Sequence, residues 1–308
     1  MIDRLDAMRV FVTALDKGSL AGAGRTLGRS PAAVTRAIAF LEGHVGAQLL
    51  HRTTRKMRLT ETGERYASVC QHVLTNLEEA ELSAAGDRAA PRGVLTVTAP
   101  VMFGTRILRP IVGAFLRSYP AVQIRYLLLD RIVNMIDEGV DVAVRIATLP
   151  DSSLIGMPIG DVRRVLCASP DYLARKPLIK APSDLSEHDC IAVAQLTPNG
   201  TWTFPPAPGS RIARTVRVKP RLMVNADEVA VDAAVAGEGI IRIMSYKIDS
   251  EVRNGRLVVL LPEDELPRLP VHLIVPEGRL AIAKVRAFVD FTRPRLKSEF
   301  ASMGRPWP

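Results

Sequence analysis

The sequence predicts an α/β protein with an N-terminal winged helix-turn-helix, a linker helix and a larger C-terminal α/β domain of two lobes. Short helical patterns followed by two strand-like pieces fill residues 1–60, and a longer helical pattern dominates residues 61–92. Strands and helices then alternate over residues 93–308. The 308 residues are enough for about two domains, and an apolar content of 47% argues against long disordered segments.

Three helices are predicted near the N-terminus, because apolar positions recur every three or four residues between clear end signals. They cover residues 3–17, 19–28 and 30–46. The third has the clearest beginning, since Ser30 is a favoured N-cap residue and Pro31 suits the first helical position. Two short strands are predicted at 48–52 and 57–59. Three helices followed by a β-hairpin are the outline of a winged helix-turn-helix.

Positive charge is concentrated in the same part of the chain. The whole sequence carries a net charge of +9, which is typical of proteins with an acidic partner, although an arginine-rich composition alone also produces it. Residues 25–58 contain seven lysines and arginines against a single acid, Glu42. A general arginine bias would not concentrate charge in this way. The segment therefore predicts a nucleic-acid surface, with a solvated charged face as the alternative.

A long helix is predicted over residues 60–86, where apolar side chains recur at gaps of three and four. Such a seam suits pairing with a second copy of the chain, and packing against its own domain is the alternative. Three glutamates near its end, Glu78, Glu79 and Glu81, make it unsuitable as a DNA surface. Residues 87–93 are expected to form a linker.

The C-terminal part alternates between strand and helix patterns, which predicts βαβ units and mostly parallel sheets. Strands are expected at 94–99, 122–129, 141–146, 162–168, 239–244, 257–261 and 271–275, and helices at 100–118, 131–138, 226–236 and 281–300. Residues 195–215 are expected to be irregular. We expect one lobe from about 93–165 with 268–308, and the other from about 166–267.

Several classes of protein are disfavoured. Cys70, Cys167 and Cys190 are odd in number and far apart, so neither a disulfide framework nor a zinc site is expected. The first residues lack the apolar segment of a signal peptide, and no apolar run is long enough for a membrane span, so we expect a cytoplasmic protein without a membrane partner. HExxH, GxSxG and GxxxxGK[ST] motifs are absent, so neither an enzyme nor a metal or other cofactor is expected.

Particular runs of residues closely resemble the LysR-type transcriptional regulators of bacteria. In the N-terminal part they are Phe11-Val12, Gly18-Ser19-Leu20-Ala21, Leu27-Gly28, Ser30-Pro31-Ala32-Ala33-Val34-Thr35-Arg36-Ala37-Ile38 and Gly46-Ala47-Gln48-Leu49-Leu50-His51-Arg52. In the C-terminal part they include Ala99-Pro100, Tyr119-Pro120, Glu138-Gly139, Asp141-Val142-Ala143-Val144-Arg145 and Leu166-Cys167-Ala168-Ser169-Pro170. The resemblance covers about residues 3–300. It implies a two-lobed C-terminal domain like that of periplasmic binding proteins, and a small effector in the cleft between its lobes.

The resemblance also has departures. Family members usually carry alanine where Gly22 and Gly24 stand, and each glycine costs its helix about 1 kcal/mol relative to alanine. Ala99 stands where many members place a serine or threonine that contacts the effector. The two glycines put the stiffness of the second helix in question. Alanine at position 99 weakens the inference that this position contacts an effector in this chain.

The third helix is expected to enter the major groove of double-stranded DNA, with Arg36 as the candidate for a bidentate contact to guanine. A phosphate contact or an internal contact to Glu42 is the alternative for Arg36, and helix capping is the alternative for Pro31. The predicted DNA contacts are Arg29, Ser30, Pro31, Ala32, Thr35, Arg36, Arg52, Thr53, Thr54, Arg55 and Lys56. The last five would form the wing.

The resemblance places the effector at residues around the lobe cleft. These are Ala99, Pro100, Val101, Met102, Phe103, Arg145, Gln195, Thr197, Trp202, Asn225 and Met244. A small organic acid is expected, because the helix that starts at Pro100 would present amide groups to an anion and Arg145 would pair with a carboxylate. The alternative for Arg145 is an internal ion pair with Asp130 or Asp141, and the other residues equally suit structural roles.

Together these features predict a sequence-specific DNA-binding transcriptional regulator. Two copies joined through residues 60–86 would bind an interrupted inverted repeat, and the family implies a dimer of dimers. RNA polymerase is a further candidate partner. One alternative is a ligand-independent DNA-binding repressor or architectural protein. Another is a thiol sensor, although Cys167 has no basic neighbour closer than Arg164 to favour its thiolate.

Overall fold

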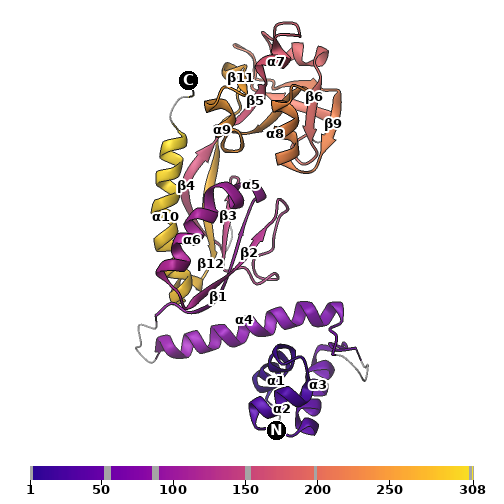
Figure 1. Ribbon diagram of the computed structural model, residues 1–308, viewed down its shortest axis with the longest axis vertical. Helices are drawn as coiled ribbons and strands as arrows, with labels where there is room; N and C mark the ends of the chain where they lie inside the picture. Colours follow the sequence, from indigo (N-terminus) through magenta and orange to yellow (C-terminus); the bar gives the residue numbers. More distant parts are fainter. Residues whose placement is uncertain are drawn as a thin grey trace.

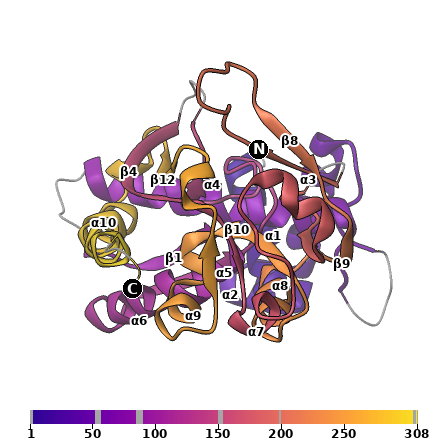
Figure 2. The same ribbon diagram turned by 90° about the horizontal axis from the view of Figure 1, so that it is seen from above.

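The computed structural model describes residues 3–51, 57–84, 90–149, 154–197, 200–304 and 307. Figure 1 shows a small helical domain, a long helix beside it, and two lobes that follow one another along the long axis of the molecule. Viewed from above, α10 and α6 lie along one flank, while β8 lies at the opposite edge (Figure 2). Within the described ranges, no helix combines the length and the apolar character that a membrane span needs.

The helical domain consists of α1 (Arg4–Asp16), α2 (Leu20–Leu27) and α3 (Pro31–Val45), close to the predicted bounds. The hydroxyl oxygens of Ser19 and Ser30 accept the backbone N–H groups of Gly22 (3.0 Å) and Ala33 (3.2 Å), and so cap α2 and α3. Gly46 ends α3 with φ 73°, a left-handed conformation that favours glycine. Local capping chemistry therefore sets the ends of the last two helices.

The base of the predicted wing is attached to α3 by a side chain. One oxygen of the Glu42 carboxylate accepts the backbone N–H groups of Leu49 (2.8 Å) and Leu50 (3.2 Å). Leu50 and Leu59 form a single antiparallel bridge, which is shorter than the predicted hairpin. Residues 52–56 between them lie outside the described part of the chain.

The long helix α4 (Glu61–Ala84) confirms the predicted helix, and one face of it packs on the helical domain. Ala67, Cys70 and Leu74 are buried in the same core cluster as Phe11 of α1. The alternative of packing against its own domain is therefore confirmed for this face. Val69 remains 39% exposed on the same helix.

The first lobe is built on a five-stranded sheet with the order β2-β1-β3-β12-β4. Its strands are β1 (Gly93–Ala99), β2 (Val122–Leu128), β3 (Val142–Ile146), β4 (Leu154–Val162) and β12 (Leu269–Pro276). A continuous helical stretch follows β1, formed by α5 (Val101–Phe103), a π-turn (Gly104–Leu108) and α6 (Arg109–Ser118). The C-terminal helix α10 (Ala283–Met303) packs against β4 and α6 of this lobe.

The second lobe is built on a five-stranded sheet with the order β11-β5-β10-β6-β9. Its strands are β5 (Arg164–Ala168), β6 (Cys190–Val193), β9 (Pro220–Val224), β10 (Ile240–Met244) and β11 (Val258–Leu260). Helix α8 (Asp227–Val235) packs on this sheet, and the hairpin of β7 (Thr201–Phe204) and β8 (Arg214–Arg217) covers a separate small core. The short helices α7 (Pro170–Leu173) and α9 (Asp249–Arg253) complete the lobe.

The prediction of mostly parallel sheets was wrong. In each five-stranded sheet, two strand pairs are parallel and two are antiparallel. The sequence pattern missed β4, which contains two glycines and a proline and pairs antiparallel with β12. Phe300 of α10 occupies the space that a Cβ on Gly160 would need, so this glycine permits the helix to approach the strand.

Two local predictions were also wrong. Residues 131–138 form turns rather than a helix, because the side-chain oxygen of Asn134 accepts the N–H groups of Ile136 and Asp137 and Arg131 pairs with Glu138. Residues 195–215 contain the β7–β8 hairpin, which buries Trp202 and Phe204 beneath the second sheet. In both cases contacts between side chains override the local sequence pattern.

Candidate nucleic-acid interface and effector site

Helix α3 has one buried and one exposed face, as the sequence pattern indicates. Val34, Ala37, Ile38 and Leu41 face the core. Ala32, Thr35, Arg36 and Ala39 are exposed on the other side. The exposed stripe is therefore available to a partner along the length of the helix.

Arg36 is the exposed cation of this stripe, and it has no ion pair among the described residues. Its neighbour Thr35 donates its hydroxyl to the carbonyl of Pro31 at 3.0 Å, which leaves the hydroxyl oxygen free to accept. The alternative of an Arg36–Glu42 contact is not observed, since Glu42 is occupied by the backbone N–H groups at the base of the wing. The guanidinium of Arg36 has five N–H donors, and no ion pair with a described residue occupies them.

Arg29 lies at the start of the α3 segment and is already paired. Its two terminal nitrogens donate to the two carboxylate oxygens of Asp6 at 2.7 and 2.6 Å, which joins α1 to the turn before α3. The hydrogen bonds and the charge of Arg29 lower the pKa of Asp6. A phosphate contact by Arg29 therefore has to compete with Asp6 for the same donors.

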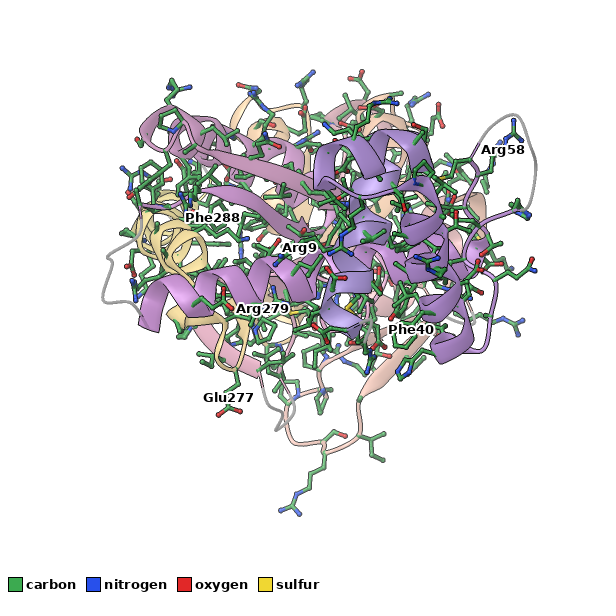
Figure 3. The ribbon with its side chains drawn as sticks, turned by 90° about the horizontal axis from the view of Figure 1, so that it is seen from below. Arg9, Phe40, Arg58, Glu277, Arg279 and Phe288 are labelled. Atoms are coloured by element: carbon green, nitrogen blue, oxygen red, sulfur yellow. The ribbon has the colours of Figure 1, made fainter. Side chains whose placement is uncertain are left out.

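The other predicted DNA contacts separate into two groups. Ser30 caps α3, Pro31 occupies its first turn and Ala32 is exposed there, so the capping role of Ser30 and Pro31 is visible while contacts with DNA stay predictions. Arg52, Thr53, Thr54, Arg55 and Lys56 all lie outside the described residues. Figure 3, which views the molecule from below, shows Arg58 pointing outward at the edge of the helical domain.

The predicted effector residues have very different accessibilities. Ala99, Met102, Phe103, Thr197, Trp202 and Met244 are buried, Pro100 and Arg145 are intermediate, and Val101, Gln195 and Asn225 are exposed. Ala99, Met102 and Phe103 belong to the core that also includes Val97 and Leu108. Trp202 donates its indole N–H to the hydroxyl of Thr197 at 3.1 Å. The buried members therefore have structural contacts of their own.

A carboxylate already lies where the sequence predicted an effector anion. Oδ1 of Asp130 accepts the backbone N–H of Val101 at 3.1 Å, at the beginning of α5. This contact satisfies one of the free amide groups at the helix start. An external anion at this position would meet the negative charge of Asp130.

Arg145 has neither of the internal ion pairs that were its alternative. Asp141 pairs with Arg279, and Asp130 accepts from Val101. One terminal nitrogen of Arg145 donates to the carbonyl of Val144 at 3.1 Å, while the other is buried without a hydrogen-bond partner. Burial lowers the pKa of Arg145.

The junction of the lobes contains polar residues that the sequence analysis did not identify. Lys247 and Asp227 form an ion pair in which both side chains are buried. Oδ1 of Asp227 and the hydroxyl of Tyr246 are buried there without a hydrogen-bond partner. Arg106 of the first lobe donates to the carbonyl of Lys247 at 2.7 Å. The one available signal was Lys247, a lysine three positions after the mostly apolar strand β10.

The thiols are poor candidates for redox chemistry. Cys70, Cys167 and Cys190 are all buried. Burial raises the pKa of the Cys70 thiol to about 11 and of the Cys190 thiol to about 12, and it also raises the pKa of Cys167. Over the described ranges, no group of three or more histidine, cysteine or acidic residues could hold a metal ion.

Comparison with known proteins gives two matches to family descriptions. Residues 5–64 match the bacterial regulatory helix-turn-helix protein of the lysR family, and residues 88–297 match the LysR substrate binding domain. An HTH-type transcriptional repressor of Pseudomonas aeruginosa is 33% identical over 292 residues, which cover 94% of this chain and 91% of the relative. The regulator DmlR of Escherichia coli is 32% identical over 291 residues, covering 94% and 93%.

Solved structures of similar proteins agree with these matches. CrgA, a LysR-type transcriptional regulator from Neisseria meningitidis, is 27% identical and superimposes with a TM-score of 0.60 over 97% of this chain and 99% of that chain. The virulence activator AphB of Vibrio cholerae is 26% identical, with a TM-score of 0.60 over 93% and 97%. The two matched segments coincide with the helical domain and the two lobes. The chain therefore belongs to the LysR family of transcriptional regulators and combines a DNA-binding helix-turn-helix domain with an effector-binding domain.

Proposed function

We propose that α3 binds in the major groove of double-stranded DNA and that Arg36 recognises a base there. The observation that carries this proposal is the exposed, unpaired guanidinium of Arg36 on the face of α3 opposite the buried stripe. An arginine in this position can donate two hydrogen bonds to guanine. Residues 52–56 would add minor-groove or phosphate contacts, which increase affinity without carrying most of the specificity.

We propose that two copies pair through the face of α4 that its own domain leaves uncovered. Val69 is exposed on this helix, while Ala67 and Cys70 face the core. A symmetric pair would present two α3 helices to an interrupted inverted repeat. A dimer of such dimers at a promoter would act on RNA polymerase. The corresponding segments are residues 1–60 for DNA binding, 61–92 for pairing and 93–308 for regulation.

We propose that a small organic acid is the effector and that it binds at the junction of the lobes. Arg106 supports this location, because it reaches from the first lobe to the carbonyl of Lys247 in the second. Of the buried groups without partners, the Tyr246 hydroxyl can donate to the acid group, while Oδ1 of Asp227 can accept only from a hydroxyl or amino group of the ligand. Because Asp130 already holds the Val101 amide, the acid group is expected nearer Arg106 than the start of α5.

The direct test is a titration of the full-length protein against its own upstream DNA and a scrambled duplex, at two salt concentrations. Tighter and salt-sensitive binding to the upstream DNA is expected, since phosphate contacts release counterions. Equal affinity for both duplexes would favour an architectural role, and no binding at low salt would overturn the assignment of the α3 surface. The same footprint with and without candidate acids would instead favour a ligand-independent repressor.

A further inference from the structure

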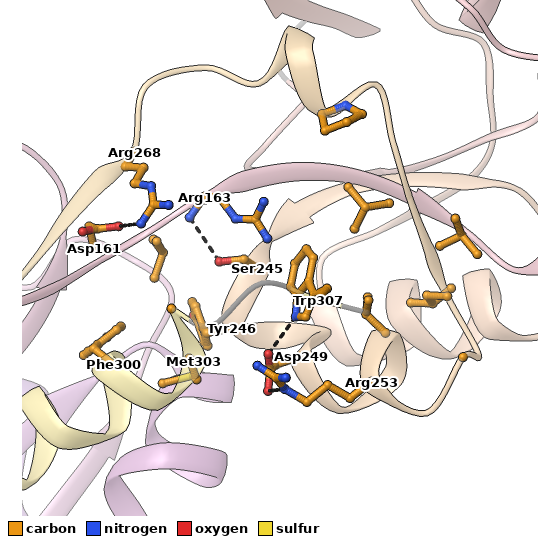
Figure 4. Close-up of a pocket in the computed structure, with 18 residues that line it drawn as sticks. Asp161, Arg163, Ser245, Tyr246, Asp249, Arg253, Arg268, Phe300, Met303 and Trp307 are labelled. Carbon is orange, nitrogen blue, oxygen red and sulfur yellow. Dashed lines mark hydrogen bonds and ion pairs between the residues drawn. The ribbon is translucent and has the colours of Figure 1, made fainter.

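A large cavity lies where the two lobes are joined, and Phe103, one of the predicted effector residues, packs against Tyr246 and Phe300 of its lining. Its volume is about 610 Å³, within the range of small-molecule sites. It is lined by the end of β4 with Arg163 after it, by Ser245 and Tyr246 after β10, by α9 and β11, and by the C-terminal end of α10. None of the eleven predicted effector residues lines it. Figure 4 shows this cavity with its lining side chains.

The cavity has an apolar part formed by both lobes. Val162 and Phe300 come from the first lobe, and Tyr246, Val252 and Leu257 come from the second. All five residues are less than a tenth exposed, so the wall is made of residues that are otherwise buried in the core. A ligand with a hydrocarbon or aromatic body would bury apolar surface against them.

The polar part of the cavity is cationic on balance. Three arginines line it, Arg163, Arg253 and Arg268, against two carboxylates, Asp161 and Asp249. Arg253 and Arg268 are held by these two carboxylates at 2.9 and 2.8 Å. Arg163 is the arginine of the three that no lining carboxylate neutralises.

Arg163 lies at the point where the chain passes from β4 to β5. Its guanidinium stacks on the ring of Trp307, 4.2 Å from the centroid, and Trp307 donates its indole N–H to Asp249 at 2.8 Å (Figure 4). The acceptor of the Arg163 side chain is Glu265, at 3.3 Å from one nitrogen. Burial raises the pKa of Glu265, while Arg163 and Arg268 oppose the shift. The contact uses one nitrogen of the guanidinium.

We propose that this cavity at the junction of the lobes binds a small amphipathic carboxylate. The carboxylate group would lie on Arg163 and the hydrocarbon part on the apolar wall. The planar guanidinium has further N–H donors that can hold a carboxylate through two hydrogen bonds. Because the wall comes from both lobes, the ligand would act as a second effector to the extent that its affinity differs between lobe arrangements. The proposal rests on Arg163 and not on the effector proposed beside Arg106, although Tyr246 belongs to both groups of residues.

The test is calorimetric titration of the full-length protein with phenylacetate and with phenylacetamide, which has the same shape without the charge. Phenylacetate is expected to bind about tenfold or more tightly than the amide. Arg163→Gln should weaken phenylacetate binding by about the same factor and leave the amide unchanged. Arg221→Gln serves as the matched control, because Arg221 is an exposed arginine paired with Asp189 outside the cavity, and it should change neither affinity.

A second measurement locates the ligand even if Arg163→Gln folds poorly. The chain has two tryptophans, and only Trp307 lines the cavity. Phenylacetate should therefore change the fluorescence of the natural protein and should lose this effect in Trp307→Phe. Equal affinities for the acid and the amide, no binding of either, or an effect that Arg106→Gln removes and Arg163→Gln retains would overturn the proposal.

Discussion

Asp6 and Arg29 form a bidentate ion pair between the first helix and the turn that leads into α3, with oxygen–nitrogen distances of 2.6 and 2.7 Å. The pair is partly exposed, with 31% of the Asp6 side chain and 37% of the Arg29 side chain accessible. The pair orients the start of α3, and it also occupies Arg29, which could otherwise contact a DNA phosphate. Stability of the domain and affinity for DNA are therefore expected to respond to it in opposite directions.

Asp6→Asn should strengthen binding to DNA, because it releases Arg29 for a phosphate. The logarithm of the binding constant should fall more steeply with the logarithm of salt concentration, by about 0.9 for one added phosphate contact. Titrations at several salt concentrations measure this slope. Asp3→Asn is the matched control, since Asp3 is an exposed acid at the start of the same helix whose side chain caps nothing. The same slope in both variants would contradict the role of Arg29.

The Asp6–Arg29 pair also predicts a pH dependence of stability. Because the pKa of Asp6 is lowered in the folded protein, its contribution is complete above the ordinary aspartate pKa of about 4 and is lost as pH falls through the lowered value. The natural protein should be more stable than Asp6→Asn at neutral pH, and the difference should disappear in acid. Urea denaturation at a series of pH values measures it, and a difference independent of pH would count against the ion pair as its cause.

Arg36→Ala should remove specific DNA binding without changing the stability of the protein. A lost base contact costs about 1–3 kcal/mol, or roughly fivefold to 150-fold in affinity. Arg65→Ala is the control, because Arg65 is an exposed arginine of α4 that pairs with Glu61. Footprinting and thermal denaturation are the measurements. A footprint like that of the natural protein would exclude Arg36 as the base-reading residue.

Two glycines near the DNA-binding domain should respond oppositely to alanine. A Cβ on Gly63 would collide with the carbonyl oxygen of Leu49, so Gly63→Ala should disturb the packing of α4 on the base of the wing and cost about 1–3 kcal/mol. A Cβ on Gly43 meets nothing within 4 Å, so Gly43→Ala should stabilise α3 by about 0.5–1 kcal/mol. Thermal denaturation of the two variants checks both signs. Similar changes in melting temperature for the two variants would show that helix propensity, and not the close contact with Leu49, decides the effect of alanine at position 63.

The buried pair of Lys247 and Asp227 should be costly to break on one side only. Lys247→Met leaves the Asp227 carboxylate buried without its cation and should destabilise the protein by about 3–5 kcal/mol. Asp227→Asn combined with Lys247→Met should recover part of this loss, because the uncompensated charge is gone. Urea denaturation of the single and double variants measures the difference. A double variant less stable than Lys247→Met would show that charge is not the cause.

Local signals were sufficient for much of the fold. Ser19 and Ser30 cap helices whose apolar stripes the sequence already shows, and Gly46 ends α3 in the left-handed conformation. These features depend on residues within a few positions of one another, so the winged helix-turn-helix domain and the exposed stripe with Arg36 could be predicted. The resemblance of these residues to a known family had the same local basis.

Local signals failed where distant contacts decide the structure. Strand β4 has glycines and a proline in its sequence, yet β12 and α10 provide its pairing and packing. The segment around Asn134 has a helical pattern, yet side-chain hydrogen bonds and the Arg131–Glu138 pair hold it in turns. The β7–β8 hairpin is stabilised by a core to which Tyr172 and Ile240 contribute.

The sequence by itself determined the class of protein. Composition can be counted directly, and the placement of charge and the capping patterns depend on residues that are close together in the chain. The tertiary structure alone decided which polar groups meet at the lobes. Lys247 and Asp227 are twenty residues apart, and Arg163 and Trp307, which stack on each other, are 144 residues apart. Burial and ion pairing depend on which segments lie together in space, and no short-range pattern records that.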